Sequence, residues 1–158
     1  TKLYNYGYFS KRVSEETARA ERYKRSVGLI MIDIDHFKKY NDTYGHQKGN
    51  EVLSAIAGIL QKNVRQSDIV FRYGGEEFVV MLPETAMEAQ EIAERLREKV
   101  AEKKFITKGG QKVSVSISLG VSYHPYPVKT QYDLVERSDK ALYKAKETGR
   151  NKVCIYEG

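Results

Sequence analysis

Two pairs of carboxylate residues stand beside apolar runs and are the residues in this 158-residue chain best suited to chemistry. The first pair, Glu76 and Glu77, follows two glycines at 74–75, between the apolar runs 69–73 and 78–82. Two such runs around a glycine pair predict a β-hairpin whose turn needs positive φ angles. The glycines would let a large substrate approach the backbone, and adjacent strand residues point to opposite faces, so Glu76 and Glu77 are expected to have different roles. By itself, Gly-Gly-Glu is more typical of a solvated turn.

The second pair, Asp33 and Asp35, ends the apolar run 27–32. The run predicts a buried strand, and a period of two places Asp33 and Asp35 on one face and Ile34 on the other. Clustered carboxylates repel one another, so they need a cation or a basic side chain close by. Hard oxygen ligands beside a phosphate substrate favour Mg²⁺. A strand end that points into water is the alternative.

Both carboxylate pairs belong to longer motifs. Residues 72–78 read Arg-Tyr-Gly-Gly-Glu-Glu-Phe, and residues 33–46 read Asp-Ile-Asp-His-Phe-Lys-Lys-Tyr-Asn-Asp-Thr-Tyr-Gly-His. Motifs of this length and in this order resemble the GGDEF domain of diguanylate cyclases, in its GGEEF variant. The resemblance covers residues 3–152 and implies an enzyme that condenses two GTP into cyclic di-GMP and releases two pyrophosphates. It also implies catalysis across a homodimer and feedback inhibition by the product.

The resemblance implies roles for the acidic residues. Asp33, Glu76 and Glu77 form the expected catalytic group. Asp33 and Glu76 are the expected metal ligands, with the main-chain carbonyl of Ile34 as a third, and Glu77 is a secondary candidate. Two Mg²⁺ per active site are implied, with Mn²⁺ as the alternative metal; one ion activates the attacking hydroxyl and the other stabilises the leaving pyrophosphate. For Asp35 we expect a structural or supporting role ahead of direct coordination.

Phosphate contacts are expected at two helix ends. The start of a helix favours an anion, and the amides expected to bind phosphate there belong to His36, Phe37 and Lys38. Lys146 and Arg150 match the phosphate-contacting pair of the resembled family. On the residues alone, a basic pair at the end of a helix is more typical of a cap that complements the helix dipole.

Guanine selection is expected to rest on Asn41 and on position 50. An asparagine can both donate to and accept from a base edge. Asn50 stands where many members of the resembled family carry aspartate, so one acceptor is replaced by a donor and the negative charge is absent. Relatives altered at this position also accept ATP, so strict guanine selectivity stays open.

An inhibitory product site is expected at Arg65 and Asp68, which precede the hairpin at the position of the family's Arg-x-x-Asp motif. A cyclic dinucleotide is a dianion with guanine edges, so an arginine for phosphate and a carboxylate for base N–H groups suit it. Arg95 or Arg97 would supply a second surface; we assign Arg95 to the site, although both are also typical of solvated helix residues.

The remaining patterns predict the elements that position these residues. Helical periodicity or capping signals predict helices over 8–24, 36–44, 49–63, from a Thr85/Glu88 capping box onward, and over 131–147. Residues 113–122 alternate apolar with small polar side chains and predict one strand, ended by His124 to Pro127; 152–156 predicts the last strand. The expected fold is α/β (α+β): a central, mainly antiparallel five-stranded sheet surrounded by helices. The resemblance to the GGDEF domain implies that this fold is palm-like and similar to that of nucleotidyl cyclases.

Composition bounds the class of protein. A 41% hydrophobic chain of this length predicts one domain, residues 1–158, which starts inside the family's N-terminal motif and is therefore expected to be excised from a longer protein with an upstream sensory or receiver domain. No apolar run approaches the roughly 20 residues that span a bilayer. The single cysteine, Cys154, excludes an internal disulfide and is expected to be a core thiol in a cytoplasmic protein, whose full-length form can still be membrane-tethered.

The net charge of +6 suggests an anionic partner. Nucleic acid is the first candidate, but no basic run with interleaved aromatic residues supports it, and nucleotide phosphates would account for the charge equally well. Two alternatives from other classes remain. One is a non-catalytic receptor domain for GTP or cyclic di-GMP, and the other is a nucleic-acid-binding domain suggested by charge alone.

Overall fold

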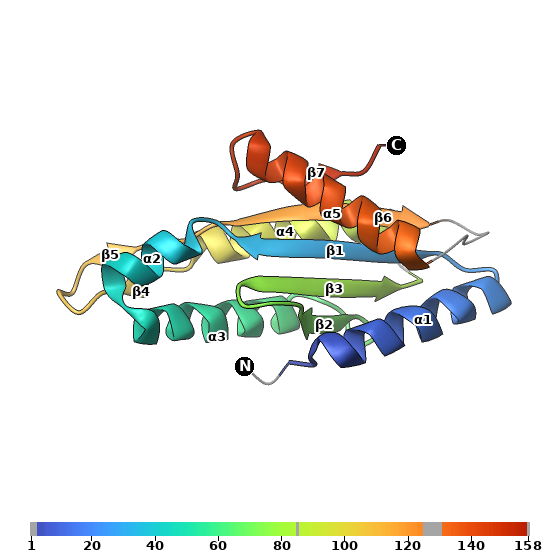
Figure 1. Cartoon of the computed structure of the whole chain (residues 1–158), viewed down its shortest axis with the longest axis horizontal. Helices are drawn as coiled ribbons and strands as arrows, with labels where there is room; N and C mark the ends of the chain where they lie inside the picture. Colours follow the sequence, from blue (N-terminus) through green and yellow to red (C-terminus); the bar gives the residue numbers. More distant parts are fainter. Residues whose placement is uncertain (1–2, 85, 125–130, 158) are drawn as a thin grey trace.

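The computed structural model describes residues 3–84, 86–124 and 131–157 and is built around a five-stranded sheet (Figure 1). The strand order is β2-β3-β1-β6-β7; the first three pairings are antiparallel and β6 pairs with β7 in parallel. The prediction of a mainly antiparallel five-stranded sheet is confirmed. The strands of this sheet are β1 (Val27–Ile34), β2 (Ile69–Arg72), β3 (Glu77–Pro83), β6 (Ile117–His124) and β7 (Val153–Ile155).

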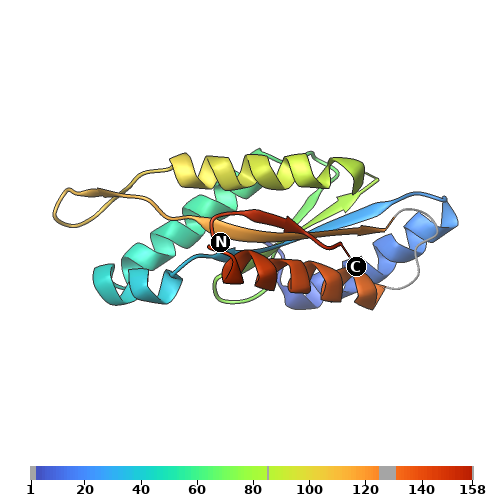
Figure 2. The same ribbon diagram turned by 90° about the horizontal axis from the view of Figure 1, so that it is seen from above.

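Helices cover both faces of the sheet. Figure 2 shows α3 and α4 on one side and α1 and α5 on the other. Side chains of β1 alternate between the two resulting cores: Ile30 and Ile32 pack in the core that contains α3 and α4, whereas Leu29 and Met31 pack in the core that contains α1 and α5. The same alternation turns Asp33 toward α5. The helices are α1 (Tyr6–Arg22), α2 (Phe37–Tyr44), α3 (His46–Lys62), α4 (Ala89–Glu102, after a 3₁₀ turn at Ala86–Glu88) and α5 (Gln131–Glu147).

The strand predicted over 113–122 is two strands in two sheets. β5 (Lys112–Val113) pairs with β4 (Phe105–Ile106) in a small hairpin, and β6 begins only at Ile117. The chain leaves one sheet and joins the other between them, where the amide of Asp35 bonds the carbonyl of Ser116 at 2.9 Å. Alternation of apolar and polar residues continues through such a crossing, so the pattern could not reveal the break.

Helix starts differ from the predicted ones. α3 begins at His46, three residues before the predicted start, directly after Gly45 with its left-handed φ of 92°. One member of the predicted capping box, Thr85, lies outside the described residues. The residue that precedes α4 is Glu88, whose side chain makes no capping bond. The Glu88 carboxylate instead forms an ion pair with Arg65.

Cys154 does not lie where the sequence predicted it. Cys154 is a free thiol in β7, but it is half-buried rather than part of the core, because β7 is an edge strand. Among the residues that the structure describes, no helix is long and apolar enough to cross a membrane. The predicted end of β6 at His124 agrees with the structure, and the prolines that follow lie outside the described residues.

We expect Gly120→Ala to destabilise the domain strongly. A Cβ at Gly120 would lie 2.1 Å from the carbonyl oxygen of Ser138 and 2.2 Å from the amide nitrogen of Leu142, so α5 would have to move away from β6. Overpacking against backbone lowers the free energy of unfolding by about 1–3 kcal/mol. We expect a loss at the upper end of this range, measured by chemical denaturation. The matched control is Gly58→Ala in α3, where a Cβ meets nothing within 4 Å; it should stabilise by about 0.5–1 kcal/mol. Equal midpoints for both variants would contradict this packing argument.

Candidate active site

The two carboxylate pairs meet at one end of the sheet. β1 ends where β3 and β6 begin, and the C-terminal end of α5 lies beside the same end (Figure 1). In the register of the sheet, Asp33 stands opposite Glu77 on β3 and opposite Ser118 on β6. The antiparallel pairing of β1 with β3 is therefore what brings the two sequence motifs together.

The hairpin between β2 and β3 differs from the predicted turn. Its connection comprises residues 73–76, and the amides of Tyr73 and Gly74 both donate to the carbonyl of Glu77. Neither glycine has a left-handed φ, so the predicted need for positive φ is wrong. A longer connection removes the strain that a two-residue turn would impose. A Cβ on Gly75 would meet nothing within 4 Å, so its surroundings are open, as the expected approach of a large substrate requires.

Asp33 is buried beneath a lysine. The side chain is 7% exposed, and its carboxylate accepts a hydrogen bond from the ammonium group of Lys146 on α5. Burial raises the pKa of Asp33, the Lys146 ammonium lowers it and the charge of Asp35 raises it, with a net increase. Arg150 lies close enough for its charge to lower the same pKa. The predicted phosphate-binding pair thus lies beside the predicted metal ligand.

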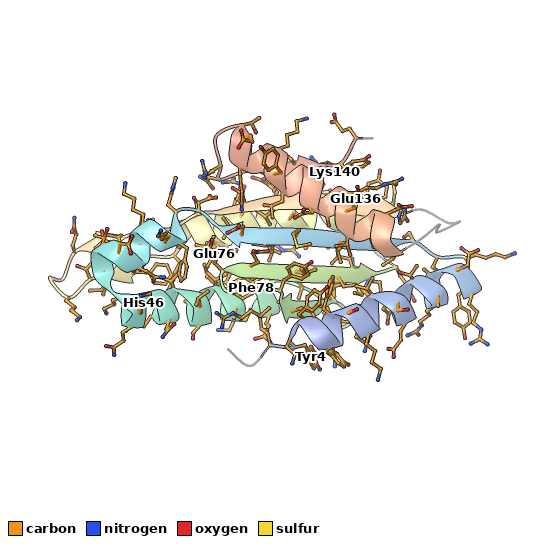
Figure 3. All side chains as sticks on the ribbon, viewed as in Figure 1. Tyr4, His46, Glu76, Phe78, Glu136 and Lys140 are labelled. Atoms are coloured by element: carbon orange, nitrogen blue, oxygen red, sulfur yellow. The ribbon has the colours of Figure 1, made fainter. Side chains whose placement is uncertain are left out.

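Glu76 and Glu77 share this environment. Burial raises the pKa of both carboxyls, the charge of Asp33 raises each further, and Lys146 opposes the increase. Figure 3 shows Glu76 at the end of the sheet where β1 leads into α2. Three carboxylates that repel one another around a single ammonium group form an environment that favours a further cation.

These residues fit a hard divalent metal ion. Carboxylate oxygens are the ligands that Mg²⁺ prefers, and two of them suffice where a substrate phosphate supplies the rest. Among the described residues, no group of three or more His, Cys, Asp and Glu side chains forms a complete metal site. Asp33 and Glu76 would therefore need a main-chain oxygen, for which Ile34 stands next to Asp33, together with oxygens from the substrate.

Asp35 is held by hydrogen bonds from three donors. The residue is 7% exposed, and its carboxylate accepts hydrogen bonds from Ser116 Oγ and Ser118 Oγ, both at 2.6 Å, and from the amide of Asn151 at 3.0 Å. Sequence reasoning missed these three partners. The serines were visible as the small polar positions of 113–122, but the pattern could not show which carboxylate they bond.

The start of α2 leaves its first amides without a side-chain cap. His36 precedes the helix in a left-handed conformation, with a φ of 55°, and makes no capping bond. The ring of Phe37 is buried, whereas Lys38 is exposed. The helix start predicted for phosphate binding is thus present, beside the end of β1.

Asn41 and Asn50 lie on the packed helices α2 and α3. The Oδ1 atom of Asn41 is buried and has no hydrogen-bond partner among the described residues, whereas Asn50 is exposed. A Cβ on Gly49 would lie 1.7 Å from that Oδ1 atom, so only glycine leaves room for the Asn41 amide in this position. An unpaired buried acceptor of this kind is suited to an N–H donor from a ligand.

The predicted product site lies in a separate pocket of about 590 Å³ between α1 and the α3–β2 connection. Arg65 and Asp68 line it, with Arg12 and Arg19 of α1, which sequence reasoning did not identify. Asp68 is 8% exposed; one carboxylate oxygen accepts from the Arg65 amide at 2.9 Å, and the other has no hydrogen-bond partner in the part of the chain that the structure describes. Arg95 does not line the pocket, but its charge lowers the pKa of Asp68, whereas Arg97 bonds Glu94 and Asn151 elsewhere.

We expect Asp68 to make stability depend on pH. Burial raises its pKa, outweighing Arg65 and Arg95, and Glu88 raises it further. A carboxyl whose folded pKa is raised contributes stability that is present below the ordinary aspartate pKa of about 4 and is lost as pH rises through the folded value. The melting temperature of the natural domain minus that of Asp68→Asn should therefore fall across this window. A difference that stays constant, or rises, would contradict the burial effect.

Comparison with known proteins adds independent findings. The family described as "Diguanylate cyclase, GGDEF domain" matches residues 1–152. The chain is 47% identical over 133 residues to diguanylate cyclase A of Treponema denticola, which covers 84% of the chain, and 43% identical over 155 residues to the response regulator PleD of Caulobacter vibrioides, which covers 97%. It spans only 36% and 34% of the lengths of these relatives.

Solved structures agree with the fold. The GGDEF domain of DgcB from Caulobacter crescentus in complex with c-di-GMP has a TM-score of 0.94 at 31% identity, covering 100% of this chain and 94% of that one. The active GGEEF domain of a diguanylate cyclase from Vibrio cholerae has a TM-score of 0.92 at 37% identity and covers 99% of both chains. The predicted fold is thus confirmed.

Proposed function

The chain belongs to the GGDEF domain family of diguanylate cyclases, and from this premise we propose that it condenses two GTP into cyclic di-GMP with release of two pyrophosphates. The observation that carries the proposal is the convergence of Asp33, Glu76 and Glu77 beside Lys146 at one end of the sheet. A binding domain without catalysis would not need three mutually repelling carboxylates next to its phosphate contacts.

The acidic residues would hold the metal. Asp33, Glu76 and the Ile34 carbonyl are the proposed ligands of Mg²⁺ or Mn²⁺, two ions per active site, with Glu77 in support. When bound, the metal supplies positive charge to the phosphates and lowers the pKa of the attacking 3′-hydroxyl. The carboxylates fix where that charge lies relative to the sheet, because β1 and β3 are paired through Asp33 and Glu77.

The basic residues and the start of α2 would hold the triphosphate. Lys146 and Arg150 both act electrostatically on Asp33, so a phosphate chain beside Asp33 would lie within their reach. The amides of His36, Phe37 and Lys38 add N–H donors at a helix start, where anions are favoured. Holding the α-phosphate in this way leaves it open to attack in line with the leaving pyrophosphate.

The base would be read by α2 and α3. The unpaired Oδ1 atom of Asn41 accepts one guanine N–H group, and Asn50 contributes a second acceptor from the exposed start of α3. Because Asn50 lacks the charge of an aspartate, we expect weaker discrimination against ATP than a carboxylate would give.

Partners complete the proposal. Each protomer would bind one GTP and two protomers would meet face to face, so that the 3′-hydroxyl of one nucleotide reaches the α-phosphate of the other. Product inhibition would use the pocket at Arg65 and Asp68, with Arg95 nearby. The similar DgcB domain was solved in complex with c-di-GMP, which supports a ligand of this kind. An upstream sensory or receiver domain would control dimerisation.

Incubation of concentrated protein with Mg²⁺ and GTP, ATP or both tests the proposal, with products resolved by chromatography. Cyclic di-GMP from GTP is the expected product, and mixed or adenine products would trace to Asn50. A second preparation has a dimeric coiled coil fused to the domain. This fusion enforces the dimer, so that a lack of product cannot be due to the domain being monomeric. Bound nucleotide without any product, even in the enforced dimer, would reject the cyclase and leave the receptor alternative.

A further inference from the structure

The turn between α5 and β7 has an unusual backbone. Gly149, Arg150 and Asn151 have consecutive positive φ angles of 119°, 61° and 47°. Glycine adopts such values freely, but residues with a Cβ adopt them only where the surrounding structure fixes them. Arg150 and Asn151 must therefore be held by specific contacts.

Hydrogen bonds from three elements hold this turn. The amide of Arg150 donates to the carbonyl of Ala145 in α5 at 2.9 Å, and Arg97 of α4 donates to Asn151 Oδ1 at 3.1 Å. The amide of Asn151 donates to the carboxylate of Asp35 at 3.0 Å. Two of these bonds involve an ionised group, Arg97 as donor and Asp35 as acceptor, and are stronger than a bond between neutral groups. Of the two, the bond to Asp35 holds the backbone of the turn, because its donor is the Asn151 amide.

Asp35 is itself fixed by the end of the sheet. Its amide bonds the carbonyl of Ser116 at 2.9 Å, and the hydroxyls of Ser116 and Ser118 both donate to its carboxylate. Ser118 stands opposite Asp33 in the register of β1 and β6. The Asp35 carboxylate therefore links the turn after α5 to the paired strands β1 and β6, which also carry Asp33.

The consequence concerns Arg150. Its charge acts on Asp33, although the two residues come from opposite ends of the chain and Arg150 is exposed. We propose that Asp35 is a positioning residue, which fixes the 149–151 turn so that Arg150 is held toward the phosphate site. This inference rests on the proposed function, because it takes Arg150 as a phosphate contact.

Two substitutions separate this role from metal coordination. In Asp35→Asn, the carbonyl oxygen still accepts from Asn151 and the amide group still bonds a serine hydroxyl, so the turn is retained while the charge is lost. Asp35→Ala removes every one of these bonds. A metal ligand would fail in both variants, whereas a positioning residue is largely rescued by asparagine.

The experiment is a double-mutant cycle of Asp35→Ala and Arg150→Ala. Binding of 3′-deoxy-GTP with Mg²⁺ is measured by calorimetry, because this nucleotide lacks the attacking hydroxyl and cannot be cyclised. We expect each single substitution to weaken binding about tenfold, and the Asp35 substitution to cost less than about twofold once Arg150 is absent. Asp35→Asn should bind within about threefold of the natural protein.

Hydrogen exchange in the free protein gives a second readout that needs no nucleotide. Amides of residues 149–152 should exchange faster in Asp35→Ala but keep their protection in Asp35→Asn.

Unchanged protection in the alanine variant would overturn the proposal, and so would an equal loss of binding in both Arg150 backgrounds. A loss of Mn²⁺ binding in Asp35→Asn larger than the removal of one nearby charge explains would show instead a metal ligand. If the unmodified protein does not bind 3′-deoxy-GTP, the proposed function fails. The exchange result, obtained without nucleotide, tests the role of Asp35 in the turn separately.

Discussion

Glu76→Gln should lower the rate of cyclic di-GMP formation by about a hundred- to a thousandfold while leaving the fold intact. Glutamine has nearly the same shape as glutamate, so the hairpin loses a negative charge and little packing. The substitution also removes the repulsion between residue 76 and the carboxylates of Asp33 and Glu77. The pKa values of Asp33, Glu76 and Glu77 are all raised in the natural domain. The variant is therefore expected to melt at the same temperature as the natural domain, or slightly higher. Product chromatography under saturating GTP and Mg²⁺ measures the rate.

The matched control is Glu102→Gln, an exposed glutamate in the last turn of α4, far from the hairpin in sequence. Glu102→Gln should retain the full rate, because Glu102 is not part of the proposed site. It should also leave the fold intact, because a single exposed charge contributes little to stability. If Glu76→Gln also kept a rate within threefold of natural, about 0.7 kcal/mol in activation free energy, Glu76 could not be a metal ligand. A rate restored by raising the metal concentration would instead support a ligand of reduced affinity.

The sequence supplied candidate residues for the site where these lie inside local motifs. The carboxylates at 33 and 76 were identified from their strand contexts, and the order of the elements predicted the sheet. Contacts between distant segments were out of reach. Neither the opposition of Asp33 and Glu77 nor the bond from Asn151 to Asp35 leaves a local pattern, because both arise from register and from a turn between distant elements.

Errors in the prediction have local physical causes. The glycines at 74–75 signalled a tight turn with positive φ, but the hairpin connection is longer and the strain disappears. The alternation over 113–122 continued through a crossing between two sheets. In both places a side-chain pattern was used to infer backbone geometry, and the pattern allows more than one geometry.

Lys146 has a contact that its place in the sequence does not suggest. A lysine in the last turn of a helix is typical of a dipole cap, yet this one contacts the buried carboxylate of Asp33. Breaking this part-buried ion pair leaves the buried Asp33 carboxylate without its partner, so Lys146→Met should lower the melting temperature of the metal-free domain. Methionine keeps the length of the apolar stem, which separates the loss of charge from a loss of packing.

The same substitution should change metal and nucleotide binding in opposite directions. The ammonium group of Lys146 occupies the Asp33 carboxylate in the absence of nucleotide, so Lys146→Met should bind Mn²⁺ alone about tenfold more tightly. With the phosphate contact removed, kcat/KM for GTP should fall about ten- to a hundredfold. Mn²⁺ affinity is measured by electron paramagnetic resonance at mildly alkaline pH, where protons do not compete for the carboxylates of Asp33 and Glu76.

Lys144→Met is the matched control, because Lys144 is exposed on the same helix and its side chain makes no hydrogen bond or ion pair among those found in the described residues. It should leave Mn²⁺ affinity and turnover within about twofold, as for a solvated surface charge. Losses of both Mn²⁺ affinity and turnover in Lys146→Met would indicate general damage to the site. A tighter metal and a slower reaction in one variant would show that Lys146 neutralises Asp33 in the free protein and the phosphates in the complex, so that one charge stabilises both states of the site in turn.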